Sequence, residues 1–122
     1  MVLNVADVDR SIDFYARLGL VPERLDEYRR GAVKFPSVRV APETIIDLFP
    51  PPMHTAAVRG ENMNHLCLSV DAHADELQRD LAAAGVAVES TAPGNFGARG
   101  LATSFYVRDP DGNTIELRTY RN

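Results

Sequence analysis

Several hallmarks of specialised protein classes are missing from this chain of 122 residues. It has one cysteine, Cys67, so it cannot form an internal disulfide, and a disulfide-bonded secreted scaffold is excluded. It contains no run of about 20 apolar residues, so we expect no membrane span. The first ten residues lack the basic-then-apolar order of a signal peptide, so we expect a cytoplasmic protein. With 13 Lys+Arg against 17 Asp+Glu the net charge is −4, which argues against nucleic-acid binding.

The composition that remains is that of an ordinary globular protein. Hydrophobic residues make up 45% of the chain and charged residues 25%. The length predicts one domain over residues 1–122, because single domains cluster near about 100–150 residues. These figures bound the class of protein but do not identify a function.

An internal repeat is the most informative feature of the sequence. Residues 2–5 read Val-Leu-Asn-Val and residues 67–70 read Cys-Leu-Ser-Val, an offset of 65. Near the end of each half, residues 45–48 (Ile-Ile-Asp-Leu) match residues 114–117 (Thr-Ile-Glu-Leu). Repeats of this kind indicate a duplicated structural unit.

The order of elements is the same in both halves. Asp7 is expected to cap a first helix that ends at Gly19, and Gly85 is expected to end a second helix with Asp75 and Glu76 in its first turn. Strand-like runs cover residues 1–6, 20–27, 31–40 and 44–49, then 64–70, 86–91, 102–108 and 113–119. Each half therefore reads βαβββ. We expect module one at 1–49, a proline-rich linker at 50–62 and module two at 63–122.

Strand alternation places three metal-ligand types on equivalent faces of these strands. Successive side chains point to opposite faces, so His65, Glu116 and Asp47 are expected to project away from the helix-packing side. A histidine with two carboxylates suits zinc, nickel, manganese or iron. By the repeat, a second histidine belongs five residues before Val5, just upstream of Met1, and this chain does not include it.

Simpler interpretations stand beside this one. His65 is equally consistent with a hydrogen-bonded structural histidine, and Glu116 with a strand residue paired to Arg118 or Arg39. Asp47 is also consistent with an ordinary exposed acid. We expect Cys67 to be a small buried apolar side chain and not a nucleophile, because no neighbouring residue in the sequence would activate it.

Two motifs resemble a known superfamily. Asp7, Ser11, Phe14-Tyr15 and Leu18-Gly19-Leu20 resemble the first-helix signature of the vicinal oxygen chelate proteins, and Asn64-His65-Leu66 opens the second half in that style. Residues 105–117, Phe-Tyr-Val-Arg-Asp-Pro-Asp-Gly-Asn-Thr-Ile-Glu-Leu, resemble its closing signature. The superfamily contains glyoxalases, bleomycin-binding resistance proteins and extradiol dioxygenases, and this chain resembles its small glyoxalase-like or virulence-type bacterial members. The resemblance implies an α+β fold, in which two βαβββ modules form a cupped, incomplete barrel of mixed sheet with helices outside.

The resemblance also implies a divalent metal in the cup and a homodimer. His65 and Glu116 match the second-module histidine and the C-terminal glutamate ligands, and Asp47 falls where glyoxalases carry a first-module glutamate. The first-module histidine has no counterpart in this chain, so the same resemblance leaves a weak or metal-free site open. As catalytic groups we expect Glu116 and Asp47, one of which acts as general base.

Three functions follow from these expectations. The first is a metal-dependent lyase or isomerase, like lactoylglutathione lyase, that abstracts a proton next to a carbonyl or adds a thiol to a small substrate with vicinal oxygens. The second is a metal-free drug- or metabolite-binding protein, and the third an extradiol dioxygenase. Residues 93–100 are expected to form a glycine-rich loop, either a mobile lid or rim with Arg99 available to an anionic substrate group or a plain surface connection. The expected substrate-binding side chains are Asn4, Phe49, Ser69, Arg99 and Phe105.

Overall fold

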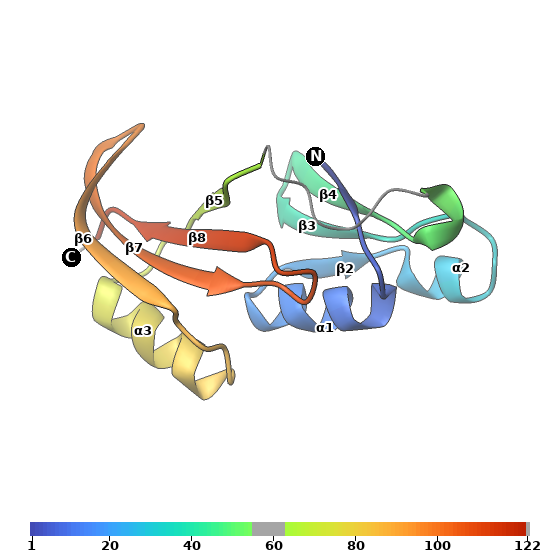
Figure 1. Cartoon of the computed structure of the whole chain (residues 1–122), viewed down its shortest axis with the longest axis horizontal. Helices are drawn as coiled ribbons and strands as arrows, with labels where there is room; N and C mark the ends of the chain where they lie inside the picture. The colour runs from blue at the N-terminus through green and yellow to red at the C-terminus, as the bar shows by residue number, and fades with distance from the viewer. Residues whose placement is uncertain (55–62, 122) are drawn as a thin grey trace. The chain divides into compact units, whose positions relative to one another are not determined.

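The computed structural model describes residues 1–54 and 63–121, apart from the side chain of Pro52. The chain divides into two compact units, Met1–Gly60 and Glu61–Asn122. Each unit combines helices with a four-stranded mixed sheet, which confirms the α+β class and the two modules predicted from the repeat (Figure 1). Among the helices of the described residues, none has the length and apolar character needed to cross a membrane.

The sheet of unit 1 has the strand order β1-β4-β3-β2. Strand β1 runs parallel to β4, and the other two pairings are antiparallel. The elements are β1 (Val2–Asn4), α1 (Val8–Arg17), β2 (Val21–Glu23), α2 (Leu25–Arg29), β3 (Ser37–Ala41), β4 (Thr44–Phe49) and the 3₁₀ helix η1 (Pro51–Met53).

The sheet of unit 2 repeats this topology with the order β5-β8-β7-β6. Strand β5 runs parallel to β8, and the remaining pairs are antiparallel. Its elements are β5 (Leu66–Ser69), α3 (Ala74–Ala83), β6 (Ser90–Gly97), β7 (Gly100–Arg108) and β8 (Thr114–Thr119). Both units thus contain the βαβββ order that the sequence predicted.

Local signals explain why the two long helices form where they do. The Asp7 side chain accepts a hydrogen bond from the backbone N–H of Arg10 at 3.0 Å, and this caps α1. The chain leaves α1 through Gly19 at φ 92°, a left-handed conformation that suits glycine, and it leaves α3 through Gly85 at φ 71°. The buried side chains of these helices are Val8, Ser11, Ile12 and Tyr15 in α1 and Leu77 and Leu81 in α3.

The strand register makes the repeat explicit. In unit 1, Val2 of β1 lies opposite Asp47 of β4. In unit 2, Cys67 of β5 lies opposite Glu116 of β8. Because Val2 and Cys67 are the matching positions of the repeat, Asp47 and Glu116 occupy equivalent places in their respective sheets.

Three of the predicted strands differ from the observed ones. The predicted strand 20–27 is only β2, because Arg24 adopts a left-handed φ of 58° and the chain turns into α2. The predicted strand 31–40 shortens to β3, which begins at Ser37. The predicted strand 86–91 is displaced toward the C-terminus and becomes β6.

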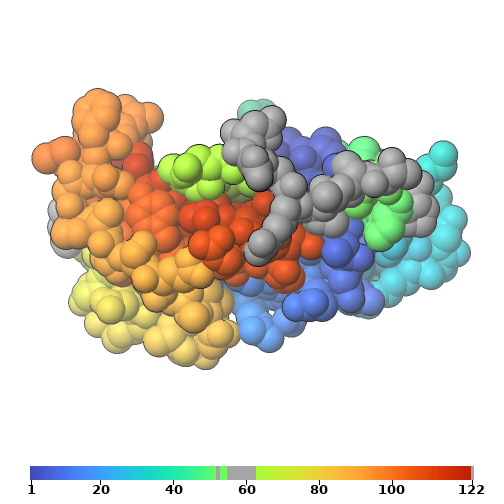
Figure 2. Space-filling view, viewed as in Figure 1, coloured from blue at the N-terminus to red at the C-terminus, as the bar shows by residue number. Residues whose placement is uncertain are grey.

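The expected loop at residues 93–100 is wrong, because these residues belong to a β-hairpin, and their role as a lid or rim stays a prediction. Strand β6 continues to Gly97, which pairs with Gly100, and only two residues form the turn between them. Pro93 and Gly94 interrupt the pairing register between Ala92 and Asn95 without ending the strand, as at a β-bulge. The hairpin, coloured orange, projects from the rest of unit 2 (Figure 2).

The predicted linker at 50–62 is described only in part. Residues 51–53 form η1, whose prolines stand at the start of the helix, where a missing N–H breaks no hydrogen bond. The remaining stretch of the prediction, residues 55–62, lies outside the described residues.

Candidate functional site

Glu116 is the most deeply buried acid of the sheet in unit 2. It lies in the middle of β8, and its side chain is only 2% exposed. Its neighbours Ile115 and Leu117 are also buried, on the opposite face. A carboxylate in this environment needs strong partners, because burial penalises the charged form.

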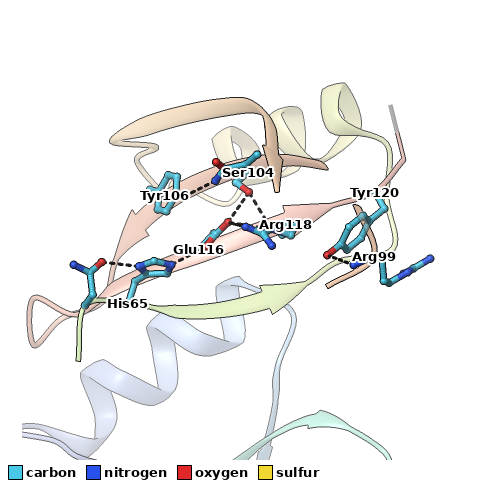
Figure 3. A network of polar contacts seen from close by, with 9 residues as sticks. His65, Arg99, Ser104, Tyr106, Glu116, Arg118 and Tyr120 are labelled. Atoms are coloured by element: carbon cyan, nitrogen blue, oxygen red, sulfur yellow. Dashed lines mark hydrogen bonds and ion pairs between the residues drawn. The ribbon is translucent and has the colours of Figure 1, made fainter. Parts of the chain in front are cut away.

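Two side chains donate hydrogen bonds to oxygen Oε1 of Glu116. The hydroxyl of Ser104 on β7 donates a hydrogen bond to Oε1 at 2.6 Å. The guanidinium of Arg118 donates to the same oxygen through Nη2 at 2.7 Å and Nε at 3.1 Å. Both partners are themselves largely buried, so Oε1 is held in one position (Figure 3).

Oxygen Oε2 faces His65, which immediately precedes β5. The distance from Nε2 of His65 to Oε2 is 2.9 Å. On the other side of the ring, Nδ1 lies 2.7 Å from Oδ1 of Asn64, and the ring edge meets Tyr106 at a centroid distance of 5.8 Å. The sequence prediction that His65 and Glu116 share one face therefore corresponds to a direct contact.

The contacts of His65 fit either a proton or a metal ion between Nε2 of the ring and Oε2 of Glu116. In the neutral tautomer in which Nδ1–H donates to the side-chain Oδ1 of Asn64, the ring presents the lone pair of Nε2 to Oε2 of Glu116. Two acceptors at 2.9 Å repel each other unless a proton or a metal ion lies between them. Metal-binding histidines characteristically donate their other N–H to an oxygen in this way.

Electrostatics keep Glu116 ionised. Burial raises its pKa, but the hydrogen bonds from Ser104 and Arg118 and the charges of Arg118 and His65 outweigh burial. The pKa of Glu116 is therefore below its usual value. Cys67, opposite Glu116, is exposed and not buried as predicted; partial desolvation and then the charge of Glu116 raise the pKa of its thiol. A thiol with a raised pKa is a poor nucleophile at neutral pH, which agrees with the role expected for Cys67.

Arg118 owes its position to a glycine on the neighbouring hairpin. A Cβ built on Gly97 would lie 1.7 Å from Nη1 of Arg118 and 2.7 Å from the hydroxyl of Tyr120. The space that a side chain at position 97 would fill is thus taken by the guanidinium. Gly97 contributes to the site by leaving this space to Arg118.

Nε2 of His65 and Oε2 of Glu116 are suitable ligand atoms for two coordination positions of one divalent metal ion. Bonds of about 2.0–2.2 Å to nitrogen and oxygen place adjacent ligand atoms about 3 Å apart, close to the separation of Nε2 and Oε2. Ser104 and Arg118 would orient the glutamate ligand, and Asn64 the histidine. Within residues 1–54 and 63–121, no group of three His, Cys, Asp or Glu side chains is arranged to hold an ion.

The third predicted ligand, Asp47, belongs to unit 1. Its side chain accepts a hydrogen bond from the Ser37 hydroxyl of β3 at 2.6 Å. Two predicted substrate-binding residues also lie in this unit. Asn4 is exposed and pairs in register with Phe49, and the Phe49 ring packs on Phe35 at a centroid distance of 4.8 Å.

The other predicted substrate-binding residues lie in unit 2. Ser69 and Arg99 line one pocket, which also contains Tyr120. Phe105 is 2% exposed and is part of the core. Sequence reasoning missed Ser104 as a site residue, and it considered Arg118 only as a pairing partner of Glu116. Alternation along β8 carried the signal for Arg118, since residues 116 and 118 share a face.

Comparisons with known proteins agree with this fold. The model of the Glyoxalase/Bleomycin resistance protein/Dioxygenase superfamily matches residues 1–117. The glyoxalase domain-containing protein RDO1 of Mycosarcoma maydis is 32% identical over 122 residues, which are 100% of this chain and 67% of that protein.

Two solved structures show the same architecture. A protein from the mobile metagenome of V. pseudocholerae is 29% identical, with a TM-score of 0.77 over 99% of this chain and 92% of that one. A lactoylglutathione lyase from Agrobacterium tumefaciens is 23% identical, with a TM-score of 0.67 over 98% of this chain and 90% of that one. At that identity the second likeness shows the fold alone.

Proposed function

This chain belongs to the Glyoxalase/Bleomycin resistance protein/Dioxygenase superfamily, and on that premise we propose that it is a glyoxalase-like lyase or isomerase. Its substrate would be a small molecule with vicinal oxygen atoms and an acidic C–H next to a carbonyl. The observation that carries the proposal is the His65–Glu116 pair, in which one carboxylate oxygen is anchored and the other faces the histidine.

Each residue of the pair has a definite task. Glu116 is held ionised by Arg118 and Ser104, so that Oε2 is able to accept a proton whenever it is not bound to a metal ion. His65, whose side chain is 35% exposed, is accessible to a ligand and fixes the direction of Oε2. Arg118 stabilises negative charge on Glu116 and keeps the carboxylate from rotating.

Superfamily members commonly bind divalent metals, and here His65 Nε2 and Glu116 Oε2 are the atoms that would hold one. A bound ion would act as a Lewis acid that stabilises negative charge on a substrate oxygen. Asp47 holds in its own sheet the register position that Glu116 holds in unit 2, and it remains our second candidate for a ligand or general base.

One observation favours a second function, the binding of a drug or metabolite without turnover. Among the described residues of unit 2, we identify two candidate metal ligands, His65 and Glu116. Nη2 of Arg118 already lies 2.7 Å from Oε1 of Glu116 and neutralises its charge. An internal cation of this kind would stabilise the carboxylate even when no metal is bound.

Metal content measured by elemental mass spectrometry separates these functions. After incubation with zinc, nickel, manganese or iron and removal of excess ion, we expect bound metal in the wild type and its loss in His65→Ala. His73→Asn is the matched control, because it removes an exposed imidazole of the same unit at the start of α3. Metal-loaded protein is then assayed with 2-oxoaldehydes, with and without thiols. Absence of metal from all samples after reconstitution would overturn the metal-dependent lyase and favour the binding protein.

The cytoplasmic location and the homodimer stay predictions. Light scattering coupled to size-exclusion chromatography tests the dimer directly: we expect about twice the chain mass of 13.4 kDa. A monomeric mass at assay concentrations would contradict it.

A further inference from the structure

A polar pocket in unit 2 is not used by the His65–Glu116 pair. It lies where the ends of β5 and β8 meet the turn of the β6–β7 hairpin, and it has a volume of about 380 Å³. Its lining residues are Ser69, Val70, Asp71, Arg99, Tyr120 and Arg121. Hydroxyl and guanidinium groups therefore dominate its polar surface.

The guanidinium of Arg99 gives this pocket a positive charge that is held in place. It lies over the ring of Tyr120, 4.7 Å from the centroid, and the backbone N–H of Arg99 donates to the Tyr120 hydroxyl at 3.3 Å. Across the described part of the chain, Arg99 forms no ion pair. Stacking on an aromatic face leaves the edge of a guanidinium available for hydrogen bonds in its own plane.

The second arginine of the pocket is already balanced. Nη1 of Arg121 lies 3.2 Å from Oδ1 of Asp71, so these two charges offset each other. Counting Arg99, Arg121 and Asp71, the pocket carries one net positive charge. The carboxylate of Asp71 disfavours a doubly charged ligand, whereas Arg99 with the Ser69 hydroxyl favours a singly charged oxyanion.

The pocket lies along the same face of the sheet as the His65–Glu116 pair. Ser69 is four residues beyond His65, a separation of roughly 13 Å at about 3.3 Å per strand residue. Between them, Cys67 lies opposite Glu116, and Ser69 itself lies opposite Arg118. Figure 3 shows the labelled side chains following one another from His65 through Glu116 and Arg118 to Tyr120 and Arg99.

We infer that this pocket binds a carboxylate group of the substrate, roughly 7–13 Å along the strand from the end that reacts at Glu116 and His65. The inference rests on the proposed function for the reacting end, but binding at the pocket itself does not require turnover. It narrows the substrate class to monoanionic carboxylic acids long enough to span both places.

Titration followed by NMR of backbone amides tests the pocket without any reaction, with acetate as the probe. We expect acetate to shift the Ser69 and Arg99 resonances saturably in the millimolar range and inorganic phosphate to bind more weakly. Arg99→Gln should weaken acetate binding about tenfold or more, because it removes a charged donor. The control Arg79→Gln removes the same charge from an exposed pair on α3 and should change nothing.

Three outcomes would overturn the inference: no saturable shift, unchanged affinity in Arg99→Gln, or tighter binding of phosphate than of acetate. Metal content and kinetic constants test the proposed function separately. His65→Ala should keep acetate binding while losing metal. For any carboxylate substrate that is turned over, Arg99→Gln should raise KM about tenfold and leave kcat unchanged. An equal KM effect on an uncharged analogue would contradict the pocket and leave the catalytic pair in place.

Discussion

Replacing Arg118 by methionine tests the electrostatic logic of the site. The substitution keeps a long unbranched side chain but removes the charge and both hydrogen bonds to Oε1 of Glu116. The side chains of Arg118 and Glu116 are 13% and 2% exposed, so water replaces the lost partner poorly. Removing one member of a buried ion pair costs about 3–5 kcal/mol. Because Ser104 and His65 still contact the carboxylate, we expect the low end, about 3 kcal/mol, or a fall in Tm of about 12 °C.

The pH dependence of this loss has a definite sign. In the wild type the pKa of Glu116 is below the ordinary glutamate value of 4.5. Its stabilising contribution is therefore fully present above pH 4.5 and is lost as pH falls through the lowered folded value. Without Arg118, burial still raises the pKa of Glu116 and two of the causes that lower it are gone, so we expect this pKa to rise and the ionised carboxylate to stabilise the variant less at neutral pH. The difference between the two proteins should be largest at neutral pH and should shrink toward about pH 4.

Urea denaturation in EDTA, at neutral pH and at about pH 4, measures the change in the free energy of unfolding of the metal-free protein. The double variant Glu116→Gln/Arg118→Met is the control, because it removes the uncompensated charge. It should be more stable than Arg118→Met alone at neutral pH. A stability loss independent of pH, or a double variant no more stable than the single one, would refute the reasoning.

Three further substitutions use the same urea assay. Gly97→Ala places a methyl group 1.7 Å from Nη1 of Arg118; the flexible guanidinium should move away at a cost of about 1–2 kcal/mol, and an unchanged stability would contradict the packing argument. Ser104→Ala removes the 2.6 Å hydrogen bond to Glu116 and should cost about 1.5–2 kcal/mol, with Ser90→Ala, an exposed serine, as a neutral control. Asp7→Ala removes the cap of α1 and should cost about 1 kcal/mol, whereas Asp7→Asn should retain most of the stability.

The features that sequence reasoning found are those with local or periodic signals. The cap at Asp7 and the glycine at Gly19 each depend on a few neighbouring residues, so α1 was predictable. The match of residues 45–48 with residues 114–117 assigns Asp47 and Glu116 to equivalent positions, and the strand registers agree. Alternation along β5 and β8 brought His65 and Glu116 to one face.

The errors arose where pairing with a neighbouring strand overrides the signal within one segment. Pro93-Gly94 is typical of a turn, but pairing with β7 carries the strand through it as a bulge. The contact of Ser104 with Glu116 depends on the register of β7 against β8, in which Tyr106 and not Ser104 lies directly opposite Glu116. No signal within the sequence fixes that diagonal contact.

The duplication helps to separate what belongs to the fold from what belongs to the site. In both units a serine of the neighbouring antiparallel strand donates to the repeated acid, Ser37 to Asp47 and Ser104 to Glu116, each at 2.6 Å. The two serines do not hold equivalent positions, because Ser37 lies directly opposite Asp47 whereas Ser104 lies opposite Arg118 and reaches Glu116 diagonally. In unit 1 the arginine of β3, Arg39, pairs with Glu23 of β2. Of the two acids, Glu116 is the one with an arginine directed to its carboxylate from its own strand and a histidine at its second oxygen. These two additions distinguish Glu116 from its repeat counterpart, and for this reason Glu116 is our first candidate and Asp47 our second.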